Sequence, residues 1–234
     1  MRTFLIAALA IGVLAGSADA ATRNFGITSF DKVRVEGPYK VRLTTGVPPF
    51  ATASGSQAAL DAVAIEMRGN TLVVHGSNSS WGGYPGQNAG PVEISLGTHE
   101  LSSAWINGSG ALAIDKAKGL SFNLSVQGSA AATIGRADVD QLSIAVVGTG
   151  SAALAGEARK VTAVVRGISS LDAANLAAKD ASLGVEGTAT VAANVSDSVK
   201  IDGNGPITVR LSGGPACTLR VSGSASVTGC KTVQ

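Results

Sequence analysis

The sequence predicts an all-β protein folded as a parallel β-helix, a solenoid in which coils of about 20 residues stack on one another. Two observations support this prediction: glycines recur at a nearly constant spacing, and apolar residues alternate with small or polar ones around each glycine. The intervals between the glycines are 20, 20, 19, 20, 16 and 20 residues. The series comprises Gly108, Gly128, Gly148, Gly167, Gly187, Gly203 and Gly223.

The apolar residues have a period of two on both sides of each glycine. In the coil that starts at Gly128, Ala132 and Ile134 follow the glycine, and Ile144 and Val146 precede the next one. Alternate side chains of a strand lie on the same face, so each coil should hold two short strands with the glycine at the turn between them. A helical interpretation fails, because glycine recurs too often and the apolar period is not 3.6.

A polar segment separates the two strand sets within each coil. Residues 115–118, 136–140 and 157–160 carry charges of both signs, and we expect them to form solvated corners. The 16-residue interval after Gly187 is expected to reflect a shortened corner. At a strand spacing of about 4.8 Å, six stacked coils would form a rod roughly 30 Å long.

The first twenty residues have the features of a secretory signal peptide. A positive charge at Arg2 precedes an apolar run over residues 4–14, and Ala18-Asp19-Ala20 matches a small-x-small cleavage site. The alternative is a retained membrane anchor, but the apolar run is short for a membrane span. We therefore expect cleavage after Ala20 and export of residues 21–234.

The exported part is expected to be a single β-helix domain. Residues 28–107 should form divergent N-terminal coils, the first of them over 30–43 around Gly37, followed by a hairpin or two short strands within 58–75. Residues 77–91 are rich in Gly, Ser, Asn and Pro, which is typical of a loop. Residues 108–230 should form the regular coils.

Charge and composition exclude two classes of partner. The chain has a formal net charge of +2 and no basic run, so nothing in it predicts nucleic-acid binding. No stretch after the signal peptide is long and apolar enough to span a membrane.

The two cysteines, Cys217 and Cys230, lie thirteen residues apart. In an oxidising compartment such an isolated pair is most simply a disulfide. A metal site is the weaker interpretation because no histidine or third thiol lies nearby, and redox catalysis is weaker again because the C-x-x-C spacing is absent.

The candidate ligand contacts are aromatic. Trp81 and Tyr84 lie in the Gly-rich loop beside asparagine and glutamine, where they could stack on sugar rings, although Trp81 could instead fold back over the coils. Trp105 lies between two residues expected to point inward, so its own side chain should face solvent.

Little in the sequence suggests catalysis. The best candidate is Asp138 with Asp140, near Arg136 and Arg159, because many β-helix enzymes cleave acidic polysaccharides with clustered aspartates. The alternation of charge between neighbouring corners is better explained by solvated salt bridges. Neither His75 nor His99 has a companion ligand or a nucleophile in a recognised motif, so we expect no metal, no cofactor and no catalytic site.

The opening segment Phe30-Asp31-Lys32-Val33-Arg34-Val35-Glu36-Gly37-Pro38-Tyr39-Lys40-Val41-Arg42-Leu43 resembles that of the GIN-domain family of auto-transporter adhesin head domains. The segment ending in Gly69-Asn70-Thr71-Leu72-Val73-Val74 and the Gly-Ser-rich coils from Asn107 onward extend the resemblance over residues 28–230. It implies a right-handed parallel β-helix in a bacterial envelope or secreted protein, without catalytic residues.

Three functions are therefore open. The first, which we favour, is a non-enzymatic, adhesin-like protein of the periplasm or cell surface that binds a glycan or an envelope protein through the β-helix flank or the 77–91 loop. The second is a polysaccharide lyase or hydrolase using Asp138 and Asp140. The third is a structural protein that self-associates through open β-helix ends.

Overall fold

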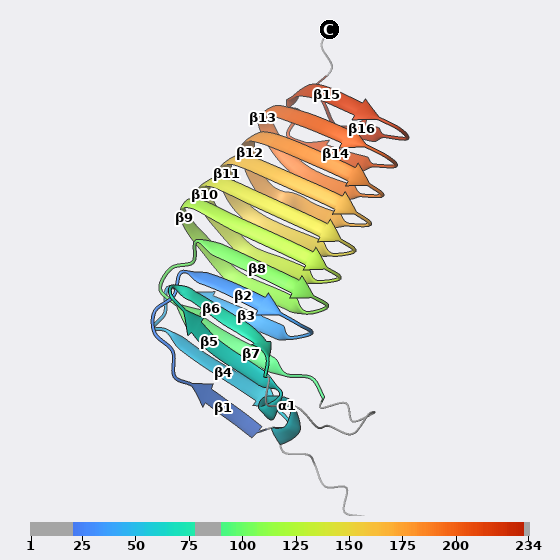
Figure 1. The fold of residues 1–234 in the computed structure, drawn as a ribbon. Coiled ribbons are helices and arrows are strands. Elements are labelled where there is room, and N and C mark those ends of the chain that lie inside the picture. Colours follow the sequence, from blue (N-terminus) through green and yellow to red (C-terminus); the bar gives the residue numbers. More distant parts are fainter. Residues whose placement is uncertain (1–20, 78–89, 232–234) are drawn as a thin grey trace, which may run out of the picture.

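The computed structural model describes residues 21–77 and 90–231 and shows a solenoid of stacked β-coils (Figure 1). The predicted parallel β-helix is thus confirmed. Successive coils of the regular part pair in parallel, strand over strand. The strands of this part are β8 (Ser103–Gly108), β9 (Ala111–Gly128), β10 (Ala131–Gly148), β11 (Ser151–Gly167), β12 (Ser170–Gly187), β13 (Thr190–Asn204), β14 (Thr208–Ser212), β15 (Ala216–Ser222) and β16 (Ser226–Thr228).

Each long strand wraps around one edge of the solenoid, which corrects the expectation of two separate short strands per coil. Strands β9 to β13 contain 15 to 18 residues each and continue through the charged corner. Register shifts mark the bend, for example between Ile134 and Ala137. Ala117 and Ala137 point inward at this bend with exposures of 0% and 1%, so the corner is charged outside but apolar inside.

The bend divides the sheet into two faces that enclose the core. The first face contains the N-terminal halves of β9 to β13, and the second face contains their C-terminal halves together with β8 and β15. Inward side chains stack in columns along the solenoid, as one column on the second face illustrates: Val126, Val146, Val165 and Val185.

The N-terminal part completes both faces and closes the solenoid end. Its elements are β1 (Ala21–Phe25), β2 (Lys32–Glu36), β3 (Lys40–Thr45), β4 (Phe50–Gly55), α1 (Gln57–Asp61), β5 (Val63–Arg68), β6 (Thr71–Gly76) and β7 (Glu93–Thr98). Strands β2 and β3 flank Gly37 and stack directly against β8 and β9. The expected hairpin is present as the antiparallel pair β5–β6.

The end cap itself was not predicted. Strand β4 pairs antiparallel with both β1 and β7, so the direction of pairing changes where the solenoid ends. Helix α1 follows β4 and is capped by Ser56, whose hydroxyl accepts the backbone N–H of Ala59 at 3.1 Å. This five-residue helix is far shorter than a membrane span, and no helix in the described residues is long and apolar enough to cross a bilayer.

The glycine column holds the turns between coils, with one correction to the predicted register. Gly128 has φ +80°, and a Cβ there would lie 2.7 Å from the carbonyl oxygen of Gly108. In the sixth coil this position belongs to Gly205 (φ +107°), whereas Gly203 pairs with Val185 and faces the core. The glycine spacing in the sequence predicts this turn at Gly203 and not at Gly205, because a glycine occurs at both positions.

Gly203 has a packing role instead. A Cβ at Gly203 would lie only 2.3 Å from Cδ1 of Ile207. The residue two positions after the turn glycine is small in the preceding coils, such as Ala130 and Ala189, but it is Ile207 here. In the coils of β9 to β12 the position of Gly203 is occupied by a valine. The side chain of Ile207 fills the volume of that valine here, and Ile207 is 1% exposed.

Candidate functional site

Trp105 lies on the outer surface of the second face, as its alternation with Ala104 and Ile106 predicts. The guanidinium carbon of Arg34 lies 4.1 Å from the centroid of its indole ring. Arg34 is itself held by Glu36, whose Oε1 accepts a hydrogen bond from Nε at 2.6 Å. A stacked guanidinium and a charge pair therefore fix the orientation of the ring.

Positions that carry amide side chains lie near Trp105 on its own strand and on the strand next to it. Trp105 pairs in register with Ser125, a small residue, and the flanking positions on that strand are Asn123 and Gln127. Asn107 lies two residues beyond Trp105 on β8 and pairs with Gln127. All of these positions alternate with buried residues and so share the outer surface. We call this surface the tryptophan platform; it comprises Arg34, Trp105, Asn107, Asn123, Ser125 and Gln127.

The platform combines an apolar ring with neutral donors and acceptors. Each amide offers two N–H donors and one carbonyl acceptor, and Ser125 offers a hydroxyl. Such a surface suits a ligand that has both apolar C–H faces and many hydroxyl groups, because the ring packs against the former and the amides bind the latter.

A second feature is a groove along the bent corner, with a volume of about 490 Å³. Its floor is formed by residues that are almost fully buried, with exposures of 6% for Val139, 5% for Ala158 and 8% for Ala178. Polar side chains on either side of the floor form its walls. We call this feature the corner groove; its polar lining comprises Lys118, Asp138, Asp140, Glu157, Arg159, Lys179, Asn194 and Ser196.

The candidate catalytic aspartates line this groove but are paired with cations. Asp138 Oδ2 lies 3.8 Å from Nζ of Lys118, and Asp140 Oδ1 lies 3.7 Å from Nη1 of Arg159. The two carboxylates are 58% and 46% exposed. Arg136 lines a different surface hollow and does not reach the groove. This arrangement resembles solvated ion pairing rather than a desolvated acid–base pair.

The histidines lie apart from both features. His75 packs at the N-terminal end of the second face, with Nε2 3.5 Å from a carboxylate oxygen of Glu66 and Nδ1 2.7 Å from the carbonyl of Gly76. His99 follows β7 in an exposed position. Within residues 21–77 and 90–231, no cluster of three or more His, Cys, Asp or Glu side chains is arranged to hold a metal ion.

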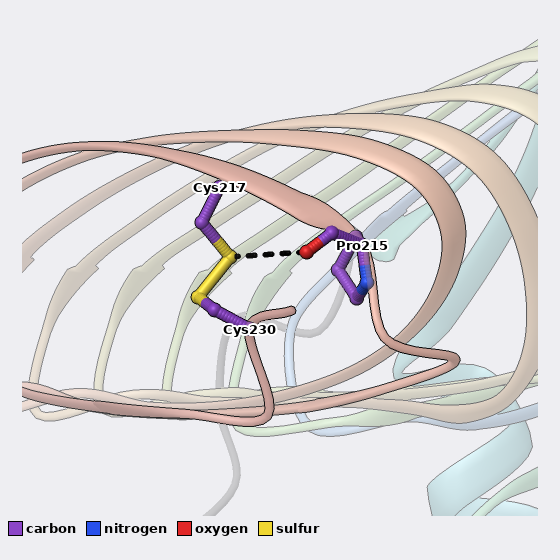
Figure 2. The surroundings of a disulfide bond; sticks show 3 residues. All are labelled: Pro215, Cys217 and Cys230. Atoms are coloured by element: carbon purple, nitrogen blue, oxygen red, sulfur yellow. Dashed lines mark hydrogen bonds between the residues drawn. A yellow bond between two sulfur atoms is a disulfide. The ribbon is translucent and has the colours of Figure 1, made fainter. Parts of the chain in front are cut away.

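The predicted disulfide is present between Cys217 and Cys230 (Figure 2). Cys217 pairs with Val199, so its side chain continues an inward column to the last coil. The bond ties the segment after β16 back to β15, and the N–H of Lys231 donates to the carbonyl of Pro215 at 2.9 Å. The same carbonyl oxygen lies 3.7 Å from the sulfur of Cys217.

Trp81 and Tyr84, the other two predicted contacts, lie outside the described residues, as does the predicted signal peptide over residues 1–20. In the chain they belong to the segment between β6 and β7. Of the three predicted contacts, the structure therefore places only Trp105.

Comparison with known proteins gives one family. The family model described as "Putative auto-transporter adhesin, head GIN domain" matches residues 29–215. A search of curated proteins finds no match to the chain.

Solved structures share the fold at low sequence identity. A "putative adhesin" from Bacteroides fragilis NCTC 9343 superposes with a TM-score of 0.76 at 17% identity, covering 92% of this chain and 96% of that one. A "putative adhesin" from Parabacteroides merdae ATCC 43184 gives 0.67 at 15% identity, with 91% and 96% covered. A "putative lipid binding protein" from Parabacteroides distasonis ATCC 8503 gives 0.61 at 19% identity, with 91% and 97% covered.

Proposed function

Because this chain belongs to the family of auto-transporter adhesin head GIN domains, we propose that it is an exported, adhesin-like protein of a bacterial envelope or surface that binds glycans through the tryptophan platform. The observation that carries the proposal is the position of Trp105, an outward indole on a sheet face that also carries amide side chains at neighbouring positions. Export is supported by the Cys217–Cys230 disulfide, because such bonds persist in oxidising compartments.

A binding role fits the platform better than catalysis. The platform contains no group placed as a nucleophile beside a base. In the corner groove, Asp138 forms an ion pair with Lys118, and Asp140 forms one with Arg159. A long sheet face supports its side chains rigidly, which lowers the entropic cost of forming a binding surface.

The test is retention of the oxidised protein on insoluble envelope glycans and on whole bacterial cells. Trp105→Ala should weaken saturable retention about tenfold, since an aromatic contact contributes about 1–1.5 kcal/mol. Trp105→Phe should retain part of the affinity. Leu120→Ala is the matched control, because Leu120 is a large apolar side chain that is 78% exposed and lies off the platform.

Equal retention of the Trp105→Ala and Leu120→Ala variants would refute the platform as the binding surface. Retention that requires neither the platform nor any glycan would point to a protein partner instead.

Self-association is a second candidate, and one observation favours it. Leu219 and Val221 continue inward columns on β15, yet they are 45% and 39% exposed. Among the described residues β15 pairs only with β13, so its other edge has no strand partner there. Sedimentation at increasing concentration tests this candidate, and a strictly monomeric protein would eliminate it.

A further inference from the structure

The corner groove offers binding chemistry that the tryptophan platform does not use. It extends over five consecutive strands, β9 to β13, which at about 4.8 Å per strand gives a length of about 19 Å. Its volume of about 490 Å³ lies within the usual range for ligand sites. The dimensions suit an extended chain that lies along the solenoid axis.

The groove walls carry equal numbers of cations and anions. The anions Asp138, Asp140 and Glu157 balance three cations of the lining: Lys118, Arg159 and Lys179. A ligand with charges of only one sign gains little from such a lining, because its attraction to one set is offset by repulsion from the other.

Four of the six charged side chains that line the groove form ion pairs with one another, which leaves one anion and one cation. Lys118 pairs with Asp138, and Arg159 pairs with Asp140. Glu157 and Lys179 lie on the adjacent strands β11 and β12 and, within the described part of the chain, neither forms a salt bridge. The register pairs Glu157 with Ala177, two residues before Lys179, so Glu157 and Lys179 flank the apolar floor on opposite sides.

The groove must recognise its ligand through side chains. The strands beneath it pair on both sides over most of their length, so no free strand edge is available to an extended peptide. The walls instead present carboxylate acceptors together with ammonium, guanidinium and amide donors, which complement hydroxyl groups. The exposed Ala177 and the aliphatic parts of the lysine and arginine side chains in the lining can pack against the C–H face of a sugar ring.

We propose that the corner groove is a second binding site, separate from the tryptophan platform, for a glycan that carries both amine and carboxylate groups. The ammonium of the ligand would pair with Glu157 and its carboxylate with Lys179, while the sugar ring lies over the floor between these two side chains.

The probe is a purified cell-wall muropeptide, a disaccharide whose peptide stem bears free carboxylates and a free amine, titrated by calorimetry into the full exported chain. Chitin, chitosan and polygalacturonate oligomers serve as neutral, cationic and anionic comparisons. We expect saturable muropeptide binding that weakens as salt is raised, with weaker binding of all three comparisons.

Glu157→Gln and Lys179→Met should each weaken muropeptide binding about threefold, as expected for a solvent-accessible ion pair. Lys160→Met and Asp180→Asn are the matched controls, because they pair with each other in register on the same strands but lie outside the groove. These two variants should bind like the unmodified protein.

Muropeptide binding that survives Glu157→Gln and Lys179→Met unchanged would overturn the proposal, as would equal or tighter binding of any single-charge or neutral oligomer to the Trp105→Ala variant, which lacks the platform indole. Trp105→Ala separates the two sites: groove binding should persist in this variant even if the platform binds nothing, and loss of muropeptide binding on Trp105→Ala would also refute a separate groove site.

Discussion

Replacing Gly167 with alanine should destabilise the solenoid at a single defined contact. Gly167 has φ +96°, and a Cβ there would lie 2.3 Å from the carbonyl oxygen of Gly148 in the coil below. That oxygen accepts the N–H of Ile168 at 2.8 Å, so it cannot recede without weakening a hydrogen bond between coils. The oxygen would have to move by about 0.7 Å, from 2.3 to the 3.0 Å below which real Cβ contacts essentially never occur.

The expected loss of stability follows from three terms. A left-handed conformation costs an alanine about 1–2 kcal/mol. Weakening the hydrogen bond to Gly148 costs about 1 kcal/mol. The lower entropy of the unfolded alanine variant offsets about 0.4–1 kcal/mol. The net decrease in the free energy of unfolding should be about 2 kcal/mol.

Two other glycines separate these terms. Gly46 has φ +76° and no atom within 4 Å of the position that a Cβ would take, so Gly46→Ala should show the conformational cost alone, about 1 kcal/mol after the entropy offset. Gly184 lies outside the left-handed region and its nearest contact would be 3.9 Å, so Gly184→Ala should be neutral or slightly stabilising.

Urea unfolding followed by circular dichroism measures the three variants, with the slope of the transition compared to check that cooperativity is kept. The expected order of stability is Gly184→Ala, then Gly46→Ala, then Gly167→Ala. If Gly167→Ala were no less stable than Gly46→Ala, stacking of the glycine column would not be the constraint on this position.

Three further predictions concern packing, the disulfide and pH. Gly203→Val should lower the free energy of unfolding by about 1–3 kcal/mol, because the valine would overpack against Ile207. Adding Ile207→Ala to the same chain should recover most of this loss. Additive effects of the two substitutions in a double-mutant cycle would contradict the compensation between the two positions. Reducing the Cys217–Cys230 disulfide should destabilise the last coil. Because coils contact only their neighbours, amide hydrogen exchange should become faster in β15 and β16 but not in β10. A uniform loss of protection along the solenoid would contradict this prediction. Burial raises the pKa of Tyr39 above its usual 10.0, so the folded state favours the protonated phenol. The free energy of unfolding should keep this contribution below pH 10 and lose it as the pH rises above 10. A Tyr39→Phe variant with the same loss of stability at alkaline pH would contradict this assignment.

The repeat architecture was predictable because each coil presents the same pattern to its neighbour. Inward columns such as the one through Val126 and Val146 need only the period of two and the coil length, both visible in the sequence. The one register error arose at Gly203, where glycine serves packing instead of turning, and periodicity alone cannot distinguish the two uses.

The end cap could not be read from the sequence. The direction in which β4 pairs with β1 and β7 depends on which edge is free once the coils have stacked. Helix α1 is only five residues long and shows no amphipathic period, although Ser56 before it is a typical N-cap.

The surroundings of Trp105 were missed, although a signal for them exists. Asn123, Ser125 and Gln127 follow Trp105 by 18, 20 and 22 residues, so the repeat length places them beside it. The corner groove is harder to foresee, because the sequence shows that the corner is charged but not that side chains on either side of Val139 and Ala158 enclose a hollow.

The most direct test of glycan binding uses Trp105 as its own reporter. Trp81 and Trp105 are the two tryptophans of the chain, so in a Trp81→Phe variant all indole fluorescence comes from the platform. Titration with a soluble fragment of whichever envelope glycan retains the protein should give a saturable change in emission, with the same affinity as the retention measured in parallel. Saturable retention of this variant with unchanged Trp105 emission would contradict the account, because the ligand would then bind elsewhere.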